Sequence, residues 1–557
     1  MIKFRFKSDF WARYLTAALG GILLALAFPK FSIAGLAWIA PGLLLFSALG
    51  ASPRIAFRAG YFGGFVYYLA TLYWLLRIPV TFLPILGWIA LAAYLSLFTA
   101  TWVWLCCRLF PSPLAQEVYP WKSVVVSALA NASWLRRTIW AFQCAAGWVA
   151  LEMVLGRFLS GFPWDFLGVS QYDKLPIIQI AEFTGVYGVS FLIIWFATSL
   201  LNTAIQLLQN PANRLVWSRE IALPLAVLFA LFYFGMHQVR AQLSRPHSRV
   251  SIALIQPSIP QTLIWDETEN ENRFQQLLKL SEDALTNQPD ILIWPEASVP
   301  NMLRHDQATA DAVIDLATRH KVWIILGSDD AERRPGGDTN APPEIDYYNS
   351  AFAVSPQGEL AGMYRKRRLV IFGEYVPFVK WLPFLKILSP AGESGFTPGT
   401  KPGAFKLGSL DVVASILICF EDTFPHLVRE YVNRNIDLLV NLTNNGWFGE
   451  SAAQWQHAAT AVFRAVENRV PLVRCANNGL TCWVDAAGAM HDIYFPGSNN
   501  IYKVGYKISE VSFLPSGERR LTFYTRYGDV FGWSCFTLTI LALARTRRRT
   551  KTLRTHG

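Results

Sequence analysis

Apolar residues gather in long runs over the first 240 residues of the chain and once more near its C-terminus. Crossing roughly 30 Å of bilayer hydrocarbon takes about 20 residues of α-helix, because each residue adds about 1.5 Å. The runs that approach this length are Phe10–Phe28, Ile33–Gly50, Ala56–Leu76, Leu83–Leu105, Ala141–Leu159, Ile177–Thr203, Ile221–Met236 and Val530–Ala544. The pattern therefore predicts an α-helical membrane domain of about eight transmembrane helices.

Basic residues lie beside alternate runs, on what would be one side of a membrane. They are Lys3, Arg5 and Lys7 before the first run, Arg54 and Arg58 after the second, Arg108, Lys122, Arg136 and Arg137 after the fourth, Arg214 and Arg219 after the sixth, and Arg545, Arg547, Arg548, Arg549, Lys551 and Arg554 after the eighth. Cytoplasmic loops carry an excess of lysine and arginine, so both termini are expected in the cytoplasm. The long segment between the seventh and eighth runs is then extracytoplasmic. Segment 111–140 contains prolines and reads either as an interfacial helix or as part of a span, and its role stays open.

Between residue 249 and about residue 511 the pattern changes to short β-rich runs that alternate with helical periodicity. The candidate strands are Val250–Gln256, Asp290–Trp294, Val322–Ser328, Asn349–Val354, Val412–Ile418, Leu438–Leu442 and Val470–Ala476. The candidate helices are Glu269–Thr286, Gln307–Arg319, Phe424–Asn433 and Ala453–Asn468. Such alternation is typical of helices layered on a sheet, and it predicts an α/β domain of about 260 residues.

Composition agrees with a membrane protein. Only 16% of the 557 residues are charged, against about 25% in an average soluble domain, and 53% are hydrophobic. These values exclude a disordered chain and argue against an ordinary cytosolic protein. The formal net charge of +11 follows from the basic cytoplasmic loops, so no nucleic-acid partner is predicted. Seven cysteines without a CxxC pair give no disulfide scaffold or structural zinc site, and no nucleotide-binding or metalloprotease motif is present, so no metal or cofactor is predicted.

Three reactive side chains follow apolar or strand-like segments of the α/β region. Glu296 ends Ile291-Leu-Ile-Trp-Pro-Glu, Lys366 lies in Tyr364-Arg-Lys-Arg-Arg, and Cys419 ends Ser415-Ile-Leu-Ile-Cys. Taken singly, each has an ordinary interpretation as a solvated acid, a solvated lysine or a buried small apolar residue. Taken together, they supply a base, a cation and a nucleophile. A carboxylate takes the proton of a thiol, the thiolate attacks a carbonyl, and an ammonium stabilises the resulting oxyanion, so the set predicts covalent acyl transfer.

The sequence resembles the nitrilase superfamily, and in particular its membrane-embedded branch, the bacterial apolipoprotein N-acyltransferases. The matching motifs are WPE at 294–296, Lys366 and Glu374 eight residues apart, FGEYVPF at 372–378, the Cys419–Glu421 segment, QPSIPQ at 256–261 with Trp265-Asp266, NLTNNGWFG at 441–449, and Trp455-Gln-His457. The order of these motifs, together with the predicted spans, carries the resemblance over nearly the whole chain.

The resemblance implies an αββα sandwich at residues 246–515 on the periplasmic face of the bacterial inner membrane. Residues 1–245 would form the N-terminal membrane domain, and residues 516–557 the last helix and a basic cytoplasmic tail. The acyl donor would be a phospholipid, and the acceptor the α-amine of a diacylglyceryl-cysteine lipoprotein. A monomer within membrane lipid is expected.

The resemblance also assigns roles to individual residues. Glu296 would be the general base, Lys366 the oxyanion-stabilising cation and Cys419 the nucleophile that becomes a thioester. The remaining residues are the supporting acids Glu374 and Glu421 and the substrate-binding aromatics Trp265, Trp447 and Phe420. Three positions depart from the family pattern, namely Arg368, Ile371 and Phe420, where His, Pro and Tyr are expected. None of these departures removes a residue of the catalytic set, so activity is still predicted.

Two other functions remain open from the sequence. One is a membrane-tethered amidase of the nitrilase type, in which water resolves the thioester. The other is a catalytically silent module that keeps only the fold. The apolar loop at 381–387 and the Trp447-Phe448 pair favour a lipid substrate over a small amide, although ordinary loop packing would also account for them.

Overall fold

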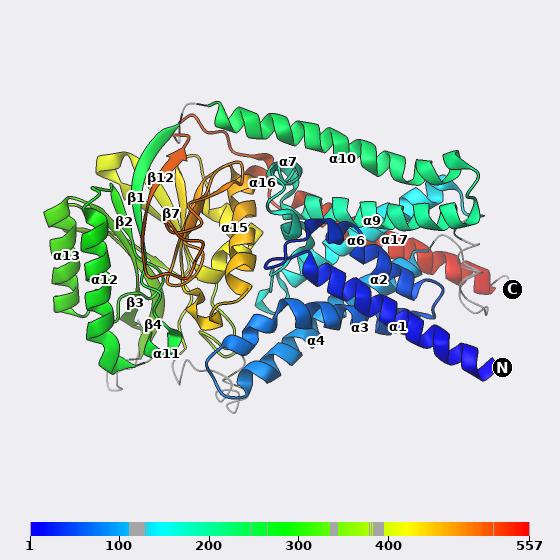
Figure 1. The fold of residues 1–557 in the computed structure, drawn as a ribbon, viewed down its shortest axis with the longest axis horizontal. Helices are drawn as coiled ribbons and strands as arrows, with labels where there is room; N and C mark the ends of the chain where they lie inside the picture. The colour runs from blue at the N-terminus through cyan, green and yellow to red at the C-terminus, as the bar shows by residue number, and fades with distance from the viewer. Residues whose placement is uncertain are drawn as a thin grey trace. The chain divides into compact units, whose positions relative to one another are not determined.

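The computed structural model describes residues 2–110, 129, 131–245, 247–264, 266–334, 344–377, 379, 381, 395–515 and 517–555 (Figure 1). The chain divides into two compact units. The first comprises Met1–Leu76, Pro84–Val239 and Asp529–Gly557, and the second comprises Arg77–Leu83 and Arg240–Gly528.

The first unit is helical. Its long helices are α1 (Ile2–Leu26), α3 (Pro53–Thr71), α4 (Leu83–Arg108), α6 (Trp134–Leu155), α9 (Val186–Gln209), α10 (Arg214–Leu243) and α17 (Val530–Thr555). Within the described residues, four helices are long and apolar enough to cross a membrane by length and composition: Leu83–Arg108, Trp134–Leu155, Val186–Gln209 and Arg214–Gln242. The structure thus supports a multi-span membrane protein, and the count of eight spans stays a prediction.

Two of the predicted spans are broken in the structure. The run Ile33–Gly50 forms a 3₁₀ helix at Ala34–Trp38 and then the nine-residue α2 (Ala40–Ala48), whose first turn contains Pro41. Proline favours the start of a helix because it has no N–H to donate to a preceding turn. The run Ile177–Thr203 begins with α7 (Leu175–Ile178) and α8 (Ala181–Thr184), and α9 starts only after Gly185 at φ 64°. Apolar composition alone does not reveal these breaks.

Small residues allow the helices of this unit to approach closely. A Cβ atom on Gly21 of α1 would lie 2.3 Å from the carbonyl oxygen of Gly63 on α3, and one on Gly63 would lie 2.4 Å from Leu44. The C-terminal helix α17 belongs to the same unit, since Asp529 just before it pairs with Arg157, and a Cβ on Gly532 would meet the sulfur of Met153 at 2.3 Å. Small residues of this kind are typical of helix contacts in membranes.

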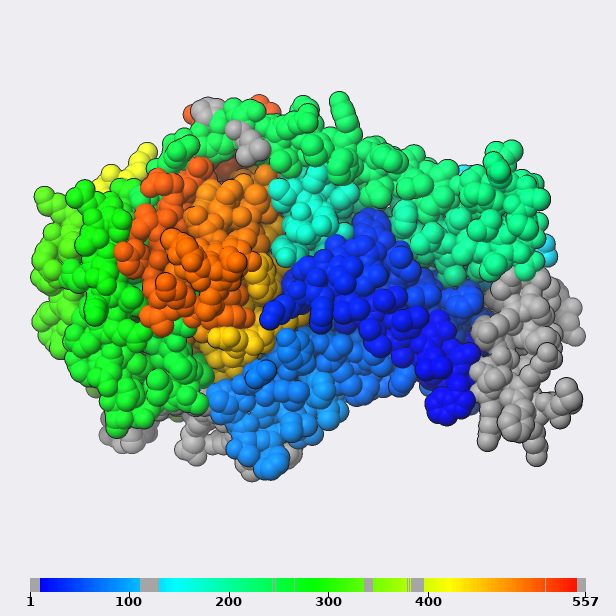
Figure 2. Space-filling model, viewed as in Figure 1, coloured from blue at the N-terminus to red at the C-terminus, as the bar shows by residue number. Residues whose placement is uncertain are grey.

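The second unit contains two six-stranded sheets. In order across the first sheet, the strands are β12 (Gly505–Phe513), β1 (Ser248–Gln256), β2 (Ile291–Ile293), β3 (Trp323–Arg333), β4 (Ile345–Val354) and β5 (Leu360–Arg365). In the second they are β11 (Met490–His491), β10 (Cys482–Val484), β9 (Leu472–Ala476), β8 (Leu438–Thr443), β7 (Val412–Ile418) and β6 (Gly403–Leu407). Figure 2 shows residues of the C-terminal part of this unit, in orange, beside green residues from its beginning, as the antiparallel pairing of β12 with β1 requires.

Helices cover the outer faces of the two sheets (Figure 1). The helices α12 (Asn270–Leu285) and α13 (Gln307–His320) pack on the first sheet around a buried cluster that includes Leu277, Val313 and Trp294. The helix α15 (Ala453–Asn468) packs on β9 and β10 of the second sheet. The sheets face each other, because the Cys475 thiol of β9 donates to the carbonyls of Ile255 and Ile293 at 3.3 Å. These four layers agree with the predicted α/β class and explain why the central strands read as continuous apolar runs.

Candidate active site

The predicted base and cation lie in contact. Glu296 follows β2 after Trp294 and Pro295, and Lys366 directly follows β5. The Lys366 Nζ donates to Glu296 Oε1 at 2.9 Å and to Glu374 Oε1 at 2.8 Å, and only 1% of the lysine is exposed. Close backbone contact at Gly327 holds the glutamate segment, since a Cβ there would lie 2.5 Å from the Pro295 carbonyl oxygen.

Neutral donors complete the environment of the two carboxylates. The Asn349 side-chain amide of β4 donates to Glu296 Oε1 and to Glu374 Oε1, each at 2.9 Å. The backbone N–H of Asn444, just after β8, donates to Glu296 Oε2 at 2.8 Å, and that of Val370 donates to Glu374 Oε2 at 2.8 Å. Each carboxylate is therefore held in one orientation from two sides, as a buried charge requires.

Lys366 keeps its charge although it is buried. Burial alone would lower the pKa of the ammonium, but the carboxylates of Glu296 and Glu374, and more weakly Cys419, raise that pKa well above its ordinary value. A lysine ammonium has three N–H donors. Two of them are used by Glu296 and Glu374, so one remains for an oxygen that carries developing charge.

The Cys419 thiol lies within the electrostatic field of the same groups. It follows β7 and begins a 3₁₀ helix at Cys419–Thr423, with a φ of 51° that is rare for a residue with a Cβ. Burial, followed by the charge of Glu296, raises the pKa of the half-buried Cys419 thiol to about 12, although the charge of Lys366 opposes the rise. At neutral pH the resting sulfur therefore holds its proton, and attack on a carbonyl requires a base.

The predicted supporting acid Glu421 ties the nucleophile segment to the lysine segment. Its fully buried carboxylate accepts hydrogen bonds from the backbone N–H of Ile418 at 2.8 Å, just before Cys419, and from that of Arg367 at 2.7 Å, just after Lys366. The Tyr364 hydroxyl donates to it at 2.8 Å. Burial raises the pKa of Glu421, and these donors counteract the rise. Glu421 thus positions two residues of the set without belonging to it.

A buried network that sequence analysis did not assign lies beside the nucleophile. His457 of α15 contacts the Cys419 carbonyl through Nε2 at 3.2 Å and Asp422 Oδ1 at 2.8 Å. Arg474 of β9 donates to Asp422 Oδ2 at 2.9 Å. Burial lowers the pKa of His457 and favours its neutral form. The Trp455-Gln-His457 motif marks this histidine in the sequence, but its contacts are long-range and no spacing predicts them.

Of the three aromatic residues predicted to bind substrate, the structure describes two. Phe420 adjoins the nucleophile and packs edge-on against Phe424, with ring centroids 5.0 Å apart. Trp447 is half-buried in the 3₁₀ turn Asn445–Phe448, three residues beyond Asn444. Trp265 and residues 382–387 lie outside the described residues, as do residues 111–128. Trp381, which opens the predicted apolar loop, is 84% exposed.

Two of the departures from the family pattern have defined surroundings. The Arg368 guanidinium stacks on the Phe424 ring at 4.8 Å, and its backbone N–H donates to Glu421 at 3.1 Å. Ile371 forms an isolated bridge with Tyr375. The Lys366 to Glu374 contact is present with both of these residues in the loop, and activity stays a prediction.

Asp329 is a further acid that sequence analysis did not single out. It pairs directly with Asn349 across β3 and β4, so the two side chains share one face of the sheet. The Oδ1 atoms of both residues are buried without a hydrogen-bond partner among the described residues. Burial, followed by the charges of Glu296 and Glu374, raises the pKa of Asp329 to about 7. When Asp329 is protonated, its carboxyl group has a hydroxyl that can donate to Asn349, whereas an ionised carboxylate has no donor.

Substituting Asp329→Asn is expected to change the pH dependence of stability. An unfolded aspartate titrates near 3.9, so between about pH 4 and pH 7 the folded protein holds a proton that the unfolded chain releases. The contribution of Asp329 to the free energy of unfolding therefore falls as pH rises through this range. The Tm of the variant relative to wild type should increase from pH 5 to pH 8. The control Asp411→Asn, at an exposed turn, should show no such trend. A Tm difference for Asp329→Asn that is constant with pH would contradict this interpretation.

Comparison with known proteins covers both units. Residues 20–199 match the family model "Apolipoprotein N-acyltransferase N-terminal domain", and residues 251–499 match the model "Carbon-nitrogen hydrolase". An apolipoprotein N-acyltransferase of Geobacter metallireducens is 38% identical over 539 residues, which cover 96% of this chain and 95% of that protein. One from Bradyrhizobium diazoefficiens is 28% identical, with 96% and 95% covered. A nitrilase-superfamily amidase structure from Nesterenkonia is 17% identical over 50% of this chain and 96% of its own, with a TM-score of 0.34.

Proposed function

The chain belongs to the apolipoprotein N-acyltransferase family, and we propose that Glu296, Lys366 and Cys419 carry out its reaction. The enzyme transfers an acyl chain from a phospholipid to the N-terminal amine of a diacylglyceryl-cysteine lipoprotein, the last step of lipoprotein maturation. The observation that carries the assignment is the buried ammonium of Lys366, held between Glu296 and Glu374 at 2.9 and 2.8 Å, in a set of charges that also acts on the Cys419 thiol.

In the first half-reaction, Cys419 Sγ attacks the sn-1 ester carbonyl of the phospholipid while Glu296 takes the thiol proton. The carbonyl oxygen becomes an oxyanion, and the remaining N–H of Lys366 stabilises it. One such donor accounts for about 10²–10³ in rate. The bond from the carbonyl carbon to the glycerol oxygen then breaks, and that oxygen takes the proton from Glu296. The products are a thioester on Cys419 and a lysophospholipid.

In the second half-reaction, the neutral α-amine of the lipoprotein attacks the thioester carbonyl. Glu296 receives one proton from the amine nitrogen as the new C–N bond forms. The C–S bond breaks, and the thiolate recovers the proton from Glu296. The high pKa of Cys419 favours this recovery and returns the resting thiol. One chain supplies every group used in both steps, so we infer that the enzyme acts as a monomer.

The membrane half fits the substrates, because both carry acyl chains. Each methylene moved into water costs about 0.8 kcal/mol, so a chain of about 16 carbons costs on the order of 10 kcal/mol. A site that receives the chain from lipid avoids most of this cost. We propose eight spans, with seven in residues 1–245 and one in 516–557, a periplasmic catalytic domain at 246–515 and both termini in the cytoplasm of the inner membrane.

Single-cysteine labelling tests this topology. The substitution Lys279→Cys places a thiol on an exposed site of α12, and Arg214→Cys places one at the start of α10. A membrane-impermeant maleimide applied to spheroplasts should label the first at once and the second only after permeabilisation. The reverse order would overturn the proposed orientation.

Product analysis separates acyl transfer from hydrolysis. The full-length enzyme is mixed with a phospholipid labelled in its sn-1 chain and with a diacylglyceryl-cysteine peptide in detergent micelles. Mass spectrometry should show an N-acylated peptide and one lysophospholipid for each label transferred. Labelled free fatty acid with unmodified peptide would instead identify an amidase-like hydrolase that uses water.

A further inference from the structure

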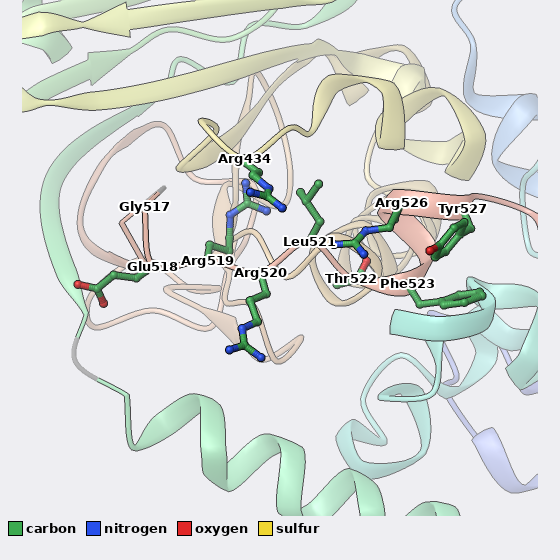
Figure 3. Close-up of a pocket in the computed structure, with 10 residues that line it drawn as sticks. All are labelled: Arg434, Gly517, Glu518, Arg519, Arg520, Leu521, Thr522, Phe523, Arg526 and Tyr527. Carbon is green, nitrogen blue, oxygen red and sulfur yellow. The ribbon is translucent and has the colours of Figure 1, made fainter.

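A basic cavity of about 640 Å³ lies at the C-terminal end of the α/β unit (Figure 3). Its lining includes four arginines, Arg434, Arg519, Arg520 and Arg526, and a single acid, Glu518. None of the three proposed catalytic residues lines it. The cavity thus gathers positive charge at a place for which acyl transfer gives no reason.

The four arginines fall into two classes. Arg519 is buried and structural, because its guanidinium donates to the carbonyls of Ile436 at 2.9 Å and Asn433. Arg434, Arg520 and Arg526 are exposed, and within the described part of the chain none of them forms an ion pair. Three guanidinium groups therefore border one cavity with no ion-pair partner among the described residues, and Glu518 is the one acid in the lining.

Only a short stretch of chain connects the lining of this cavity to a predicted span. Phe523 and Tyr527, which also line it, are 43% and 53% exposed, and their rings pack with centroids 4.7 Å apart. The helix α17, whose first part is the predicted span Val530–Ala544, begins three residues beyond Tyr527, a distance of at most about 11 Å along the chain. Aromatic side chains at this position are typical of the lipid headgroup region of a bilayer.

We propose that this cavity binds the phosphate of an anionic membrane phospholipid at the periplasmic surface. Guanidinium groups match phosphate oxygens with paired, charge-assisted hydrogen bonds. The exposed aromatic pair suits the boundary between headgroup and acyl chain. The bound lipid holds the C-terminal end of the catalytic domain against the bilayer and is not itself the group under attack by Cys419. The proposal rests on the membrane topology given above, with α17 as a span.

Lipid binding to the full-length enzyme tests the proposal. The probe is phosphatidylglycerol, titrated into enzyme in a neutral detergent and counted by native mass spectrometry, with phosphatidylcholine as the zwitterionic comparison. The test variant carries Arg434→Gln, Arg520→Gln and Arg526→Gln. The matched control removes the same charge elsewhere on the unit through Lys279→Gln, Lys401→Gln and Lys406→Gln, three exposed positions that do not line the cavity.

We expect wild type and the control to bind phosphatidylglycerol alike and the arginine variant to bind it at least tenfold more weakly. Equal binding by all three proteins, or an equal loss in the lysine control, would overturn the proposal. Inorganic phosphate that displaces the lipid at equal concentration would indicate a free-phosphate site and would also overturn it. If the triple variant unfolds, the single variant Arg520→Gln is measured instead. It should also bind phosphatidylglycerol more weakly than wild type, by a smaller factor. Unchanged binding by Arg520→Gln would contradict the proposed site.

The same samples keep this test apart from the proposed function. Thioester formation at Cys419 is measured in each variant. Normal thioester formation with unchanged lipid binding would reject the headgroup site and leave the acyltransferase assignment intact. Absence of the thioester in wild type would reject the catalytic assignment whatever the lipid binding shows.

Discussion

The rate of acyl transfer by the Cys419→Ser variant is expected to fall roughly 10⁴-fold or more. The nucleophile and its base work together, so removing the nucleophile leaves little residual catalysis. A serine hydroxyl is a much weaker acid than the thiol, and Glu296 alone does not deprotonate it in a useful time. Release of lysophospholipid from labelled phospholipid, with and without acceptor peptide, measures both half-reactions. We expect both to fall together, since the second consumes the product of the first.

A matched control separates the role of Cys419 from a general effect of cysteine loss. Cys107 is also half-buried, lies in α4 and has no role in the proposed reaction. Cys107→Ser should therefore keep transfer within a factor of about two of wild type. Substantial transfer by Cys419→Ser, with correct product, would show that another group carries the acyl chain.

The Glu296→Gln variant should form the thioester about 10²–10⁴-fold more slowly, which is the usual contribution of a general base. The substitution keeps the shape of the side chain and an oxygen for the N–H of Asn444, but the amide cannot accept the thiol proton. The residual rate should rise nearly tenfold for each pH unit, because attack then depends on spontaneous ionisation of a thiol whose pKa in the wild-type site is about 12. A stopped assay of lysophospholipid release across about pH 6 to 9 measures this slope.

Glu374→Gln provides the comparison for Glu296→Gln. Both substitutions remove one carboxylate beside Lys366, but only Glu296 is proposed to transfer protons. Glu374→Gln should therefore slow the reaction less and leave the shape of the pH profile unchanged. Equal losses and equal profiles for the two variants would show that Glu296 acts only by holding Lys366.

Much of the α/β unit is predictable from local pattern. The runs that became β1, β7 and β8 are continuous and apolar because both faces of each strand are covered, and α15 occupies the predicted range. The site residues follow strand ends, where a buried apolar run stops and a polar side chain begins. The predicted helix Phe424–Asn433 is shorter in the structure, where an α-helix at Pro425–Val428 passes into a 3₁₀ turn at Arg429–Tyr431 and Val432 is extended. Tyr431 packs against Tyr364 at the end of this segment. Helical periodicity in the sequence gives no sign of this contact between distant residues.

Other features depend on contacts between distant segments. No sequence pattern places Asn349 between two glutamates, pairs Asp329 with Asn349, or directs Glu421 to the backbone on both sides of the site. These contacts follow from sheet register and from the stacking of the two sheets. In the helical unit, a single glycine and a proline break apolar runs that hydropathy treats as continuous.

The charge arrangement explains why one buried lysine is stable in this site. Burying an unpaired ammonium is costly, and here two carboxylates and the amide that binds both of them share its environment. Burial of the thiol, and after it the charge of Glu296, keeps the sulfur protonated until a substrate carbonyl arrives. The resting enzyme therefore protects its nucleophile and has the base already in place.

The most direct measurement is the mass of the Cys419 peptide after the enzyme has met a labelled phospholipid with no acceptor present. The account predicts one acyl chain on Cys419, removed by neutral hydroxylamine as a thioester and discharged when the diacylglyceryl peptide is added. An enzyme that transfers the label to the peptide while Cys419 stays unmodified, or that carries the chain on another residue, would contradict it.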